Sequence, residues 1–457
     1  MSWRYLGAPL YVAPPPSTNS IVEGLTPERT VNLLRSLPEV PVASSGEEYR
    51  HWDKIRHLAP PDGLTHEEWW WAIKVARRQN LRKLPLNDAS GRPFQYSLPD
   101  QALRLLAFVD RHCAGEIAMP EVVTANEQAK THYLVNSLME EAIRSSQLEG
   151  ATTSRSAAKE MLRSGRTPKD RSELMILNNY RALEFMRQHA GSSLTPELVF
   201  ALHRIVTEGT LDNPDVSGRL QGPNDQRVAV FDAQDGELTH RPPPAEQLPE
   251  RLQSMCRFAN EKVDAGAFMH PVVRAILLHF WLAYDHPFED GNGRTARALF
   301  YWSMKESGYW LTDYLSISRI LRQAPSQYTR AYLETETDEG DTTYFILYQL
   351  GVIERAVKEL TRYLERKVGE VREIERLVHG SADFNHRQLA LLSDAARRTD
   401  AQYTFRSHAS THNVSEETAR TDLLELYERG LLARRRAGRR HVFTPVQDLT
   451  EKLKTSP

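Results

Sequence analysis

The sequence predicts a mainly α-helical protein: a large helical core carries a β-hairpin, and a small domain of three helices and a two-stranded ribbon follows it. Apolar residues recur at helical spacing over long stretches, the longest from Tyr344 to Leu377. Two turns, Asp235-Gly236 and Ala437-Gly438, have the flanking pattern of a hairpin. At 457 residues the chain exceeds one typical core, so we expect two or three domains.

Composition argues against several classes of protein. The formal net charge is −2 and the sequence pI is about 6.8, so global attraction to nucleic acid or to a membrane surface is not indicated. Cys113 and Cys256 are the only cysteines, too few for a disulfide framework and without metal-ligand spacing. No early apolar segment resembles a signal peptide, and no apolar run reaches the ~18 residues that span a bilayer. We therefore expect a cytoplasmic protein without a membrane partner.

The N-terminal part has signals for structure but none for chemistry. Residues 1 to about 40 include Pro14 to Pro16 and predict an irregular arm. Thr65 as N-cap, with Glu68 three residues later, predicts a helix start. The helix continues through Trp69 to Trp71, which are all buried only if it is packed on most sides. An exposed aromatic patch for recognition is the alternative.

The segment from His286 to Arg297 has the strongest functional signal in the chain. Asp290 supplies carboxylate oxygen, and Mg²⁺ is usually held by one or two carboxylates together with substrate phosphates. Gly291 and Gly293 lack Cβ, so the backbone there can approach a ligand closely. The apolar spacing after the glycines predicts a helix, whose first N–H groups would face an anion.

Basic side chains complete this segment. Arg294 and Arg297 are three residues apart and project from nearly the same face of the predicted helix. Two guanidinium groups suit a polyphosphate, because each can bind oxygens in bidentate fashion. His286 stands before the loop, where a side chain that titrates near neutrality can take a proton from a hydroxyl. The segment therefore predicts a site for the phosphates of a nucleotide.

The same run resembles the signature of the Fic family, His-Pro-Phe-x-(Asp or Glu)-Gly-Asn-Gly-Arg-x-x-Arg, at all nine specified positions. The resemblance implies transfer of AMP from ATP to a hydroxyl of a target protein. It also implies that His286 is the general base and Asp290 the Mg²⁺ ligand. Phe288 is implied to anchor the loop in the helical core.

The remaining signature residues resemble the phosphate-binding part of the family site. Gly291, Asn292 and Gly293 are implied to form an anion hole around the α- and β-phosphates. Arg294 and Arg297 would hold the outer phosphates, with Arg297 on the γ-phosphate. Related phosphotransfer toxins have lysine in place of the second glycine, so Gly293 favours nucleotidyl transfer over phosphorylation.

A second motif lies upstream, at the end of a predicted helix from Tyr133 to Leu148. Ser145 and Glu149 share a helix face, and Gly150 fits a helix C-cap. The run resembles the inhibitory helix of many Fic proteins, (Ser or Thr)-x-x-x-Glu-(Gly or Asn). The resemblance implies that Glu149 pairs with Arg297 and blocks the γ-phosphate, which is plausible because carboxylate and triphosphate oxygens compete for one guanidinium.

The predicted hairpin spans about residues 227–241. It is similar to the flap with which family members clamp a target segment as an added strand. Val228 and His240 are candidates for contact with the target. A hairpin that only packs against the helices is the alternative.

Three helix starts follow the long helix, which Gly380 is expected to end. Asn385, Phe405 and Ser415 each open a helix, and residues 434–443 predict the ribbon. This order resembles a winged helix-turn-helix, a DNA-binding form whose recognition helix would start at Ser415 and run to Arg429.

The charge of residues 384–445 leaves the partner of this domain open. Eleven arginines stand against seven aspartates and glutamates, a net of +4 in a chain that totals −2. Five arginines of the ribbon could neutralise phosphates. Glu416, Glu417 and Asp422 on the recognition helix discourage approach to a duplex, and winged helices also serve as protein-interaction or dimer modules.

We therefore expect an N-terminal helical segment with the arm in residues 1–120, a Fic domain in residues 121–380 and a winged helix in residues 381–457. The Fic domain would contain the inhibitory helix at about 133–150, the flap and the signature loop at 286–297. An autoinhibited AMP transferase that uses ATP and Mg²⁺, with self-modification and a homodimer both open, is the first hypothesis. A DNA-bound regulator that senses nucleotide is the second, and a Fic enzyme that uses another donor or removes AMP is the third.

Overall fold

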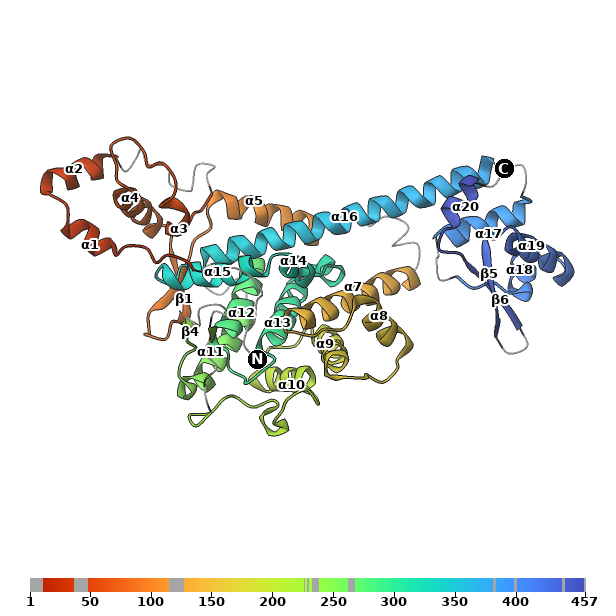
Figure 1. Cartoon of the computed structure of the whole chain (residues 1–457), viewed down its shortest axis with the longest axis horizontal. Helices are drawn as coiled ribbons and strands as arrows, with labels where there is room; N and C mark the ends of the chain where they lie inside the picture. The colour runs from red at the N-terminus through yellow and green to blue at the C-terminus, as the bar shows by residue number, and fades with distance from the viewer. Residues whose placement is uncertain are drawn as a thin grey trace. The chain divides into compact units, whose positions relative to one another are not determined.

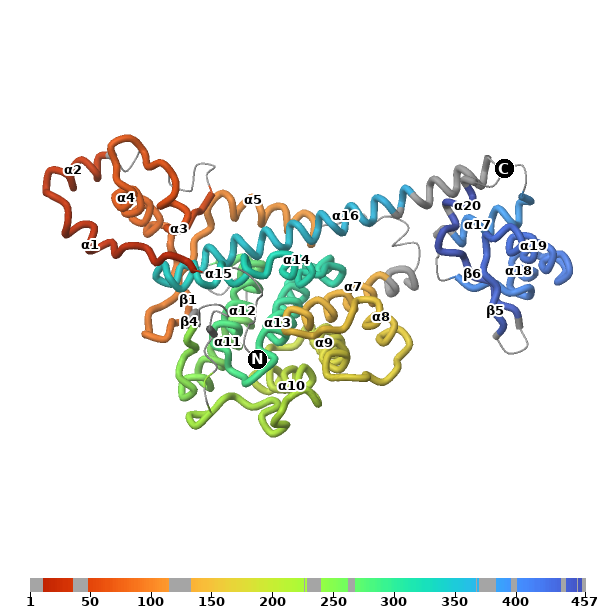
Figure 2. Tube along the Cα trace, viewed as in Figure 1, coloured from red at the N-terminus to blue at the C-terminus, as the bar shows by residue number. Residues whose placement is uncertain are grey.

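The computed structural model describes the greater part of the chain, and Figure 2 follows its trace. The described residues are 11–36, 48–114, 127–225, 227, 230–231, 238–261, 268–380, 384–397, 401–437 and 440–455. Most of them are helical, and the three sheets have two strands each, so the mainly α class is confirmed. In this part of the chain, no helix is both long enough and apolar enough to cross a bilayer.

The chain forms two compact units. The first comprises Met1–Ile117 and Leu134–Val357, and the second comprises Ala118–Tyr133 and Lys358–Pro457. Two helices, α7 (Glu127–Leu148) and α16 (Thr343–Gly380), have residues in both units. The three-domain division stays a prediction.

The first unit begins with short helices gathered around the tryptophans. They are α1 (Thr18–Glu23), α2 (Pro27–Ser36), α3 (Trp52–Ile55) and α4 (His66–Arg78). The prediction of an irregular arm is wrong for residues 18–36. Ile21 of α1 and Leu33 of α2 belong to the buried cluster that contains the tryptophans, so tertiary packing stabilises both helices.

The start of α4 is as predicted. Thr65 and Glu68 form a reciprocal capping box. The exposed fractions of Trp69, Trp70 and Trp71 are 9%, 1% and 9%, so the predicted burial is confirmed and the exposed patch is wrong. A hairpin of β1 (Arg82–Asn87) and β2 (Pro93–Tyr96) follows, and then α5 (Asp100–Val109) with one turn of π-helix, Asp110–Ala114.

The core that holds the signature is built around two adjacent helices. Helices α12 (Pro271–Asp285) and α13 (Asn292–Glu306) lie side by side, with α9 (Arg171–Gln188), α10 (Pro196–Thr207) and α11 (Leu248–Asn260) against them (Figure 1). Almost every side chain of α12 is buried, as expected for a helix that is apolar on all sides. The other elements of this region are α8 (Arg155–Ser164), short 3₁₀ turns at Pro214–Val216, Ala245–Gln247 and Trp310–Tyr314, α14 (Ile317–Gln323) and α15 (Pro325–Thr337).

The predicted hairpin is present in the expected region. Strands β3 (Val230–Phe231) and β4 (Leu238–His240) pair antiparallel, with Val230 opposite His240. Val228 and the turn lie outside the described residues.

The second unit reproduces the predicted order of elements. It contains α17 (His386–Arg397), α18 (Phe405–His412), α19 (Glu416–Glu428), the antiparallel strands β5 (Leu432–Ala437) and β6 (Arg440–Pro445), and α20 (Leu449–Thr455). Ser415 caps α19 with its side chain, and Leu423, Leu426 and Phe443 lie in the shared core. The long helix α16 is one helix of 38 residues that ends at Gly380.

One inference about this unit is wrong. Asp422 does not lie on the surface of α19, because its exposed fraction is only 2%. Its carboxylate accepts hydrogen bonds from Arg387, Asn385 and His408. Burial opposes ionisation, but these bonds outweigh it and lower the pKa of Asp422 to about 2. Asp422 is therefore a structural carboxylate and does not repel a ligand at the surface.

Candidate functional site

The signature loop turns sharply between α12 and α13. His286 ends α12 in the left-handed conformation, with φ 44° and ψ 55°, and Gly291 enters α13 with φ 83°. Phe288 is fully buried. Its N–H donates to Asn292 Oδ1 at 3.0 Å, and its carbonyl accepts from Asn292 Nδ2 at 2.7 Å. Asn292 thus braces the loop from inside, and both of its amide atoms are engaged by the main chain.

A residue that sequence reasoning missed holds the end of α12. The guanidinium of Arg227 donates to the carbonyl oxygens of Asp285 and His286, at 2.7 and 3.0 Å. Arg251 pairs with the buried Asp285 carboxylate at 2.6 Å. No local pattern could reveal these contacts, because they join residues 34 to 59 positions apart.

The candidate base lies at the edge of this braced loop. The ring of His286 is half-buried, and its Nδ1 lies 3.2 Å from Asn292 Nδ2. Burial lowers the pKa of His286, and the positive charges of His240 and Arg227 lower it further. The ring is therefore neutral near pH 7, and a neutral imidazole is the form that can accept a proton.

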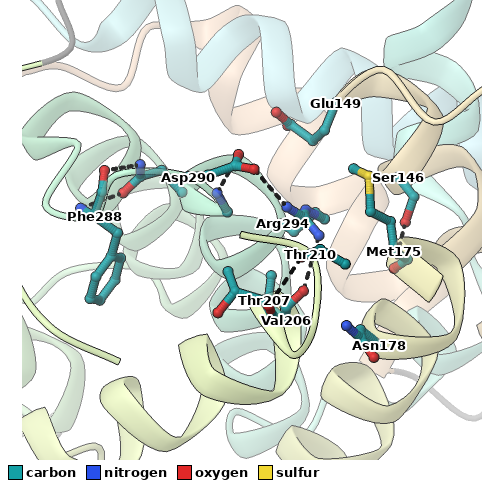
Figure 3. A network of polar contacts seen from close by, with 12 residues as sticks. Ser146, Glu149, Met175, Asn178, Val206, Thr207, Thr210, Phe288, Asp290 and Arg294 are labelled. Carbon is teal, nitrogen blue, oxygen red and sulfur yellow. Dashed lines mark hydrogen bonds and ion pairs between the residues drawn. The ribbon is translucent and has the colours of Figure 1, made fainter. Parts of the chain in front are cut away.

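The carboxylate of Asp290 has one oxygen engaged locally and the other directed toward Arg294. The N–H of Gly291 donates to Oδ1 at 2.7 Å, and Oδ2 lies 3.6 Å from Arg294 Nη2 (Figure 3). The described residues contain no group of three or more histidines, cysteines or acidic residues that could hold a metal. A single carboxylate fits Mg²⁺ that takes its other ligands from phosphates and water.

Arg294 is a buried cation with few partners. Its side chain is fully buried, and Nη1 donates to the carbonyl of Val206 at 3.0 Å. In the part of the chain that the structure describes, its Nε and Nη2 have no hydrogen-bond partner. Burial lowers the pKa of Arg294. Buried donors without partners are unfavourable, so such donors point to a ligand that the arginine binds.

Arg297 is equally buried but has more partners, and among the described residues only its Nη1 lacks a hydrogen bond. Its Nε donates to Ser145 Oγ at 2.8 Å, and its Nη2 donates to the Ser145 carbonyl at 3.0 Å and to Glu149 Oε1 at 2.8 Å. The structure therefore brings Ser145 and Glu149 of the upstream motif onto the second arginine of the signature. Gly150 has φ 94°, so glycine suits the turn after α7.

The carboxylate of Glu149 also lies against the first turn of α13. A Cβ atom added to Gly293 would lie 2.1 Å from Glu149 Oε1. The negative group thus stands at a helix N-terminus, where backbone N–H groups and the helix dipole favour an anion. Glu149 occupies the kind of position that a phosphate would need.

Both ring nitrogens of His240, a candidate for contact with the target, have partners in the core. Nδ1 of His240 is 2.9 Å from Glu336 Oε2, and Nε2 is 2.8 Å from the carbonyl of Tyr284. Burial would lower the pKa of His240, but the Glu336 carboxylate outweighs it and leaves the pKa raised. The ring of His240 therefore packs the hairpin on the core, and contact of His240 with a target stays a prediction.

Comparison with known proteins places the site in context. The Fic/DOC family matches residues 193–304. The chain is 32% identical over 117 residues to the protein adenylyltransferase Fic of Nematostella vectensis, which covers 26% of this chain and 24% of that protein. It is 40% identical over 70 residues to the protein adenylyltransferase Fic of Drosophila ananassae, which covers 15% of this chain and 14% of that protein. The chain thus spans a quarter or less of these two relatives.

A solved structure shares the fold. A Fic family protein from Desulfovibrio desulfuricans G20 is similar with a TM-score of 0.51 and 18% sequence identity. The match covers 77% of this chain and 98% of that one. At this identity the likeness concerns the fold alone.

Proposed function

This chain is a Fic-domain protein, and from that premise we propose that it transfers AMP from ATP to a hydroxyl side chain of a target protein. We further propose that Glu149 keeps the site inhibited. One observation carries this: the Glu149 carboxylate is bound by Arg297 and lies against Gly293, at the helix N-terminus that would receive phosphate oxygens.

The proposed reaction assigns one task to each group of the loop. His286 takes the proton of the target hydroxyl while that oxygen bonds to the α-phosphorus. The bond from the α-phosphorus to the bridging oxygen breaks, and pyrophosphate leaves. Buried Arg294 offers the phosphates its Nε and Nη2, which have no hydrogen-bond partner among the described residues, and Arg297 joins it once Glu149 withdraws. Mg²⁺ held by Asp290 and the phosphates would neutralise developing charge.

The target would reach the site along the β3–β4 hairpin, as an added strand. Self-modification is the simplest form of the same reaction. Two related activities use the same residues, namely transfer from another nucleotide donor and removal of AMP from a modified target. Neither of them would transfer label from ATP to protein in the experiment below.

The experiment compares incorporation of label from α-³²P-ATP and γ-³²P-ATP into protein. Wild type, Glu149→Gly and the double variant Glu149→Gly with His286→Ala are tested on the chain itself and on cell lysate. We expect label from the α position only, raised by about 10- to 100-fold in Glu149→Gly, because a hydrogen bond between charged groups is removed. The histidine change should abolish it. Label from γ-³²P-ATP would overturn AMP transfer in favour of phosphorylation, and no label from either would favour another donor or AMP removal.

We also propose that the second unit binds duplex DNA through its ribbon. Arg434, Arg435 and Arg436 of β5 are exposed, and burial of Asp422 removes one charge that argued against DNA. The order of α17, α18, α19 and the ribbon resembles a winged helix.

DNA binding is tested by fluorescence anisotropy with a random-sequence duplex. Replacing the three arginines by alanine should lower affinity and reduce the dependence of log K on log salt by roughly three, since each phosphate contact contributes about 0.9. Alanine changes at three exposed arginines of the first unit, Arg92, Arg104 and Arg181, serve as a matched charge control. Binding that is absent, or unchanged by the ribbon variant, would favour a protein-interaction or dimer role.

A further inference from the structure

His203 connects the signature loop to the segment that leads toward the hairpin. It lies on α10 and is fully buried. The N–H of Gly218 donates to its Nδ1 at 2.9 Å, so Nδ1 is an acceptor. The proton of the neutral ring is therefore on Nε2, which donates to the carbonyl of Asp290 at 2.8 Å. Both nitrogen atoms of this imidazole are satisfied by main-chain groups.

The ring also fixes the anchor of the loop. The imidazole of His203 stacks on the ring of Phe288, with centroids 3.8 Å apart and planes inclined by 12°. A Cβ atom at Gly291 would lie 2.9 Å from Thr207 Cγ2 and 3.4 Å from His203 Nε2. Helix α10 therefore closes directly against the loop, and glycine at 291 is required by this approach as well as by its positive φ.

A chain of two hydrogen bonds runs from His203 to the carboxylate of Asp290. His203 fixes the carbonyl of the peptide between Asp290 and Gly291, and the N–H of the same peptide donates to Asp290 Oδ1 at 2.7 Å. The orientation of this one peptide therefore sets the orientation of the carboxylate. Oδ2 is left facing the phosphate side, toward Arg294.

We infer that His203 is a positioning residue that orients the carboxylate of Asp290 through the Asp290–Gly291 peptide. The inference rests on the proposed function, because it assumes that this carboxylate receives Mg²⁺ together with ATP. His203 touches neither the nucleotide nor the reacting atoms. Replacing His203 should therefore reduce the factor by which Mg²⁺ increases the affinity for ATP. The affinity for ATP without Mg²⁺ should stay nearly unchanged.

The test uses calorimetric titration of the full chain with ATP, in Mg²⁺ and in EDTA, in the Glu149→Gly background. His203→Phe keeps an aromatic ring for the stack on Phe288 and removes both hydrogen bonds. We expect the ratio of the two ATP affinities to fall about tenfold, the size of one lost hydrogen bond, while the affinity in EDTA stays within twofold. An unchanged ratio in a folded variant overturns the inference.

His51→Phe is the matched control. His51 is 1% exposed, its Nδ1 accepts from the N–H of Asp53, and its Nε2 lies 3.2 Å from Thr337 Oγ1. This variant therefore loses a buried imidazole with two engaged nitrogens, away from the signature loop. It should lower the melting temperature and leave the affinity ratio unchanged. An equal fall of the ratio in His51→Phe would show that general destabilisation explains the effect, and would overturn the inference.

Two further variants separate the bonds of His203. His203→Gln offers an amide N–H near the place of Nε2, and His203→Asn offers an oxygen near the place of Nδ1. If the bond to Asp290 is the one that matters, glutamine restores more of the ratio than asparagine does. The opposite order overturns the inference.

Failure of the inference and failure of the proposed function give different results. If Glu149→Gly binds no ATP in either solution, the proposed nucleotide site itself is wrong. If it binds ATP with an Mg²⁺ dependence that His203→Phe does not change, only the positioning role is wrong.

Discussion

Arg294 and Arg297, the two arginines of the signature helix α13, differ in their hydrogen-bond partners. On the α7 side, Arg297 has Ser145 and Glu149 as partners, one of them a carboxylate. On the α10 side, Arg294 has one hydrogen bond among the described residues, to the carbonyl of Val206, and the Asp290 carboxylate lies 3.6 Å away. Both side chains are buried, so the difference lies in their partners and not in their exposure.

This difference shows how a site can be preorganised and blocked at the same time. The α10 side keeps donors free for a ligand, which would need little rearrangement there. The α7 side supplies the carboxylate of Glu149, which in the proposed function takes the place of the ligand. The proposed inhibition is therefore confined to one arginine, and the first of the four predictions below tests that division directly.

The largest expected effect concerns ATP binding to the two arginines. In the chain with Glu149 intact, Arg294→Ala should weaken ATP binding about 100-fold, because it removes charged donors that are free to meet phosphates. Arg297→Ala should change it less than about threefold, since Glu149 and Ser145 already engage that side chain. Calorimetry measures both. In Glu149→Gly the two arginine changes should become similar, and equal losses with Glu149 present would contradict the comparison.

A smaller effect is expected from replacing Glu141, a carboxylate one helical turn before Ser145 on α7. Glu141 is buried and accepts hydrogen bonds from Ser316 Oγ at 2.8 Å and from the N–H and hydroxyl of Ser318. It shares a helix face with Ser145 and Glu149 and ties that face to α14. Glu141→Gln should loosen α7 and raise AMP transfer about fivefold.

The control for this prediction is the same change in Glu149→Gly. There the inhibitory contact is already absent, so Glu141→Gln should have no further effect on the rate. A loss of activity in both backgrounds would instead mean that Glu141 serves only the stability of the fold.

The third prediction concerns the pH dependence of kcat/KM, for which only a small change is expected. Since the pKa of His286 is lowered, the ring stays neutral as the pH falls below the ordinary histidine value of about 6.5. The kcat/KM of Glu149→Gly should therefore change less than twofold between pH 8 and pH 6. A base with the ordinary pKa would lose about fourfold over that range, and that result would contradict the assignment of the shift.

The last prediction expects no effect on transfer at all. Asp422→Asn breaks a buried ion pair with Arg387 in the second unit and leaves the signature untouched. A carboxylate with a lowered pKa stabilises the fold above its unfolded pKa of about 3.9, and the contribution disappears as the pH falls through about 2. Wild type should be more stable than the variant by about 1–2 kcal/mol at pH 7, with melting curves that converge near pH 2. A change in AMP transfer would show coupling between this unit and the site.

Local signals explain what could be predicted from the sequence. Some signals involve only residues a few positions apart. They are the helix caps at Thr65 and Ser415 and the glycine at 291, and the structure has each at its predicted position. The pairing of Glu149 with Arg297 was available only through resemblance to a family, because the two lie 148 positions apart.

The sequence alone could not predict the role of residues whose partners lie far away in the chain. His203 and Arg227 have no local pattern, since the loop carbonyls that they bind, those of Asp290 and His286, lie far from them in the sequence. The sequence places Asp422 on a surface, because its burial depends on Arg387 from another helix. The sequence predicts an irregular arm, because the buried cluster that stabilises α1 and α2 includes residues far from them in the chain.

The place of Glu149 against Gly293 has a quantitative consequence. A blocking group on the same chain cannot be diluted, so its effective concentration is set by geometry and is the same at every protein concentration. If the block is worth about 2 kcal/mol, roughly 3% of molecules are open, and the apparent Kd for productively bound ATP rises about 30-fold. The ATP concentration at which the chain binds ATP productively would then be set by the strength of the Glu149 contact and not by the protein concentration.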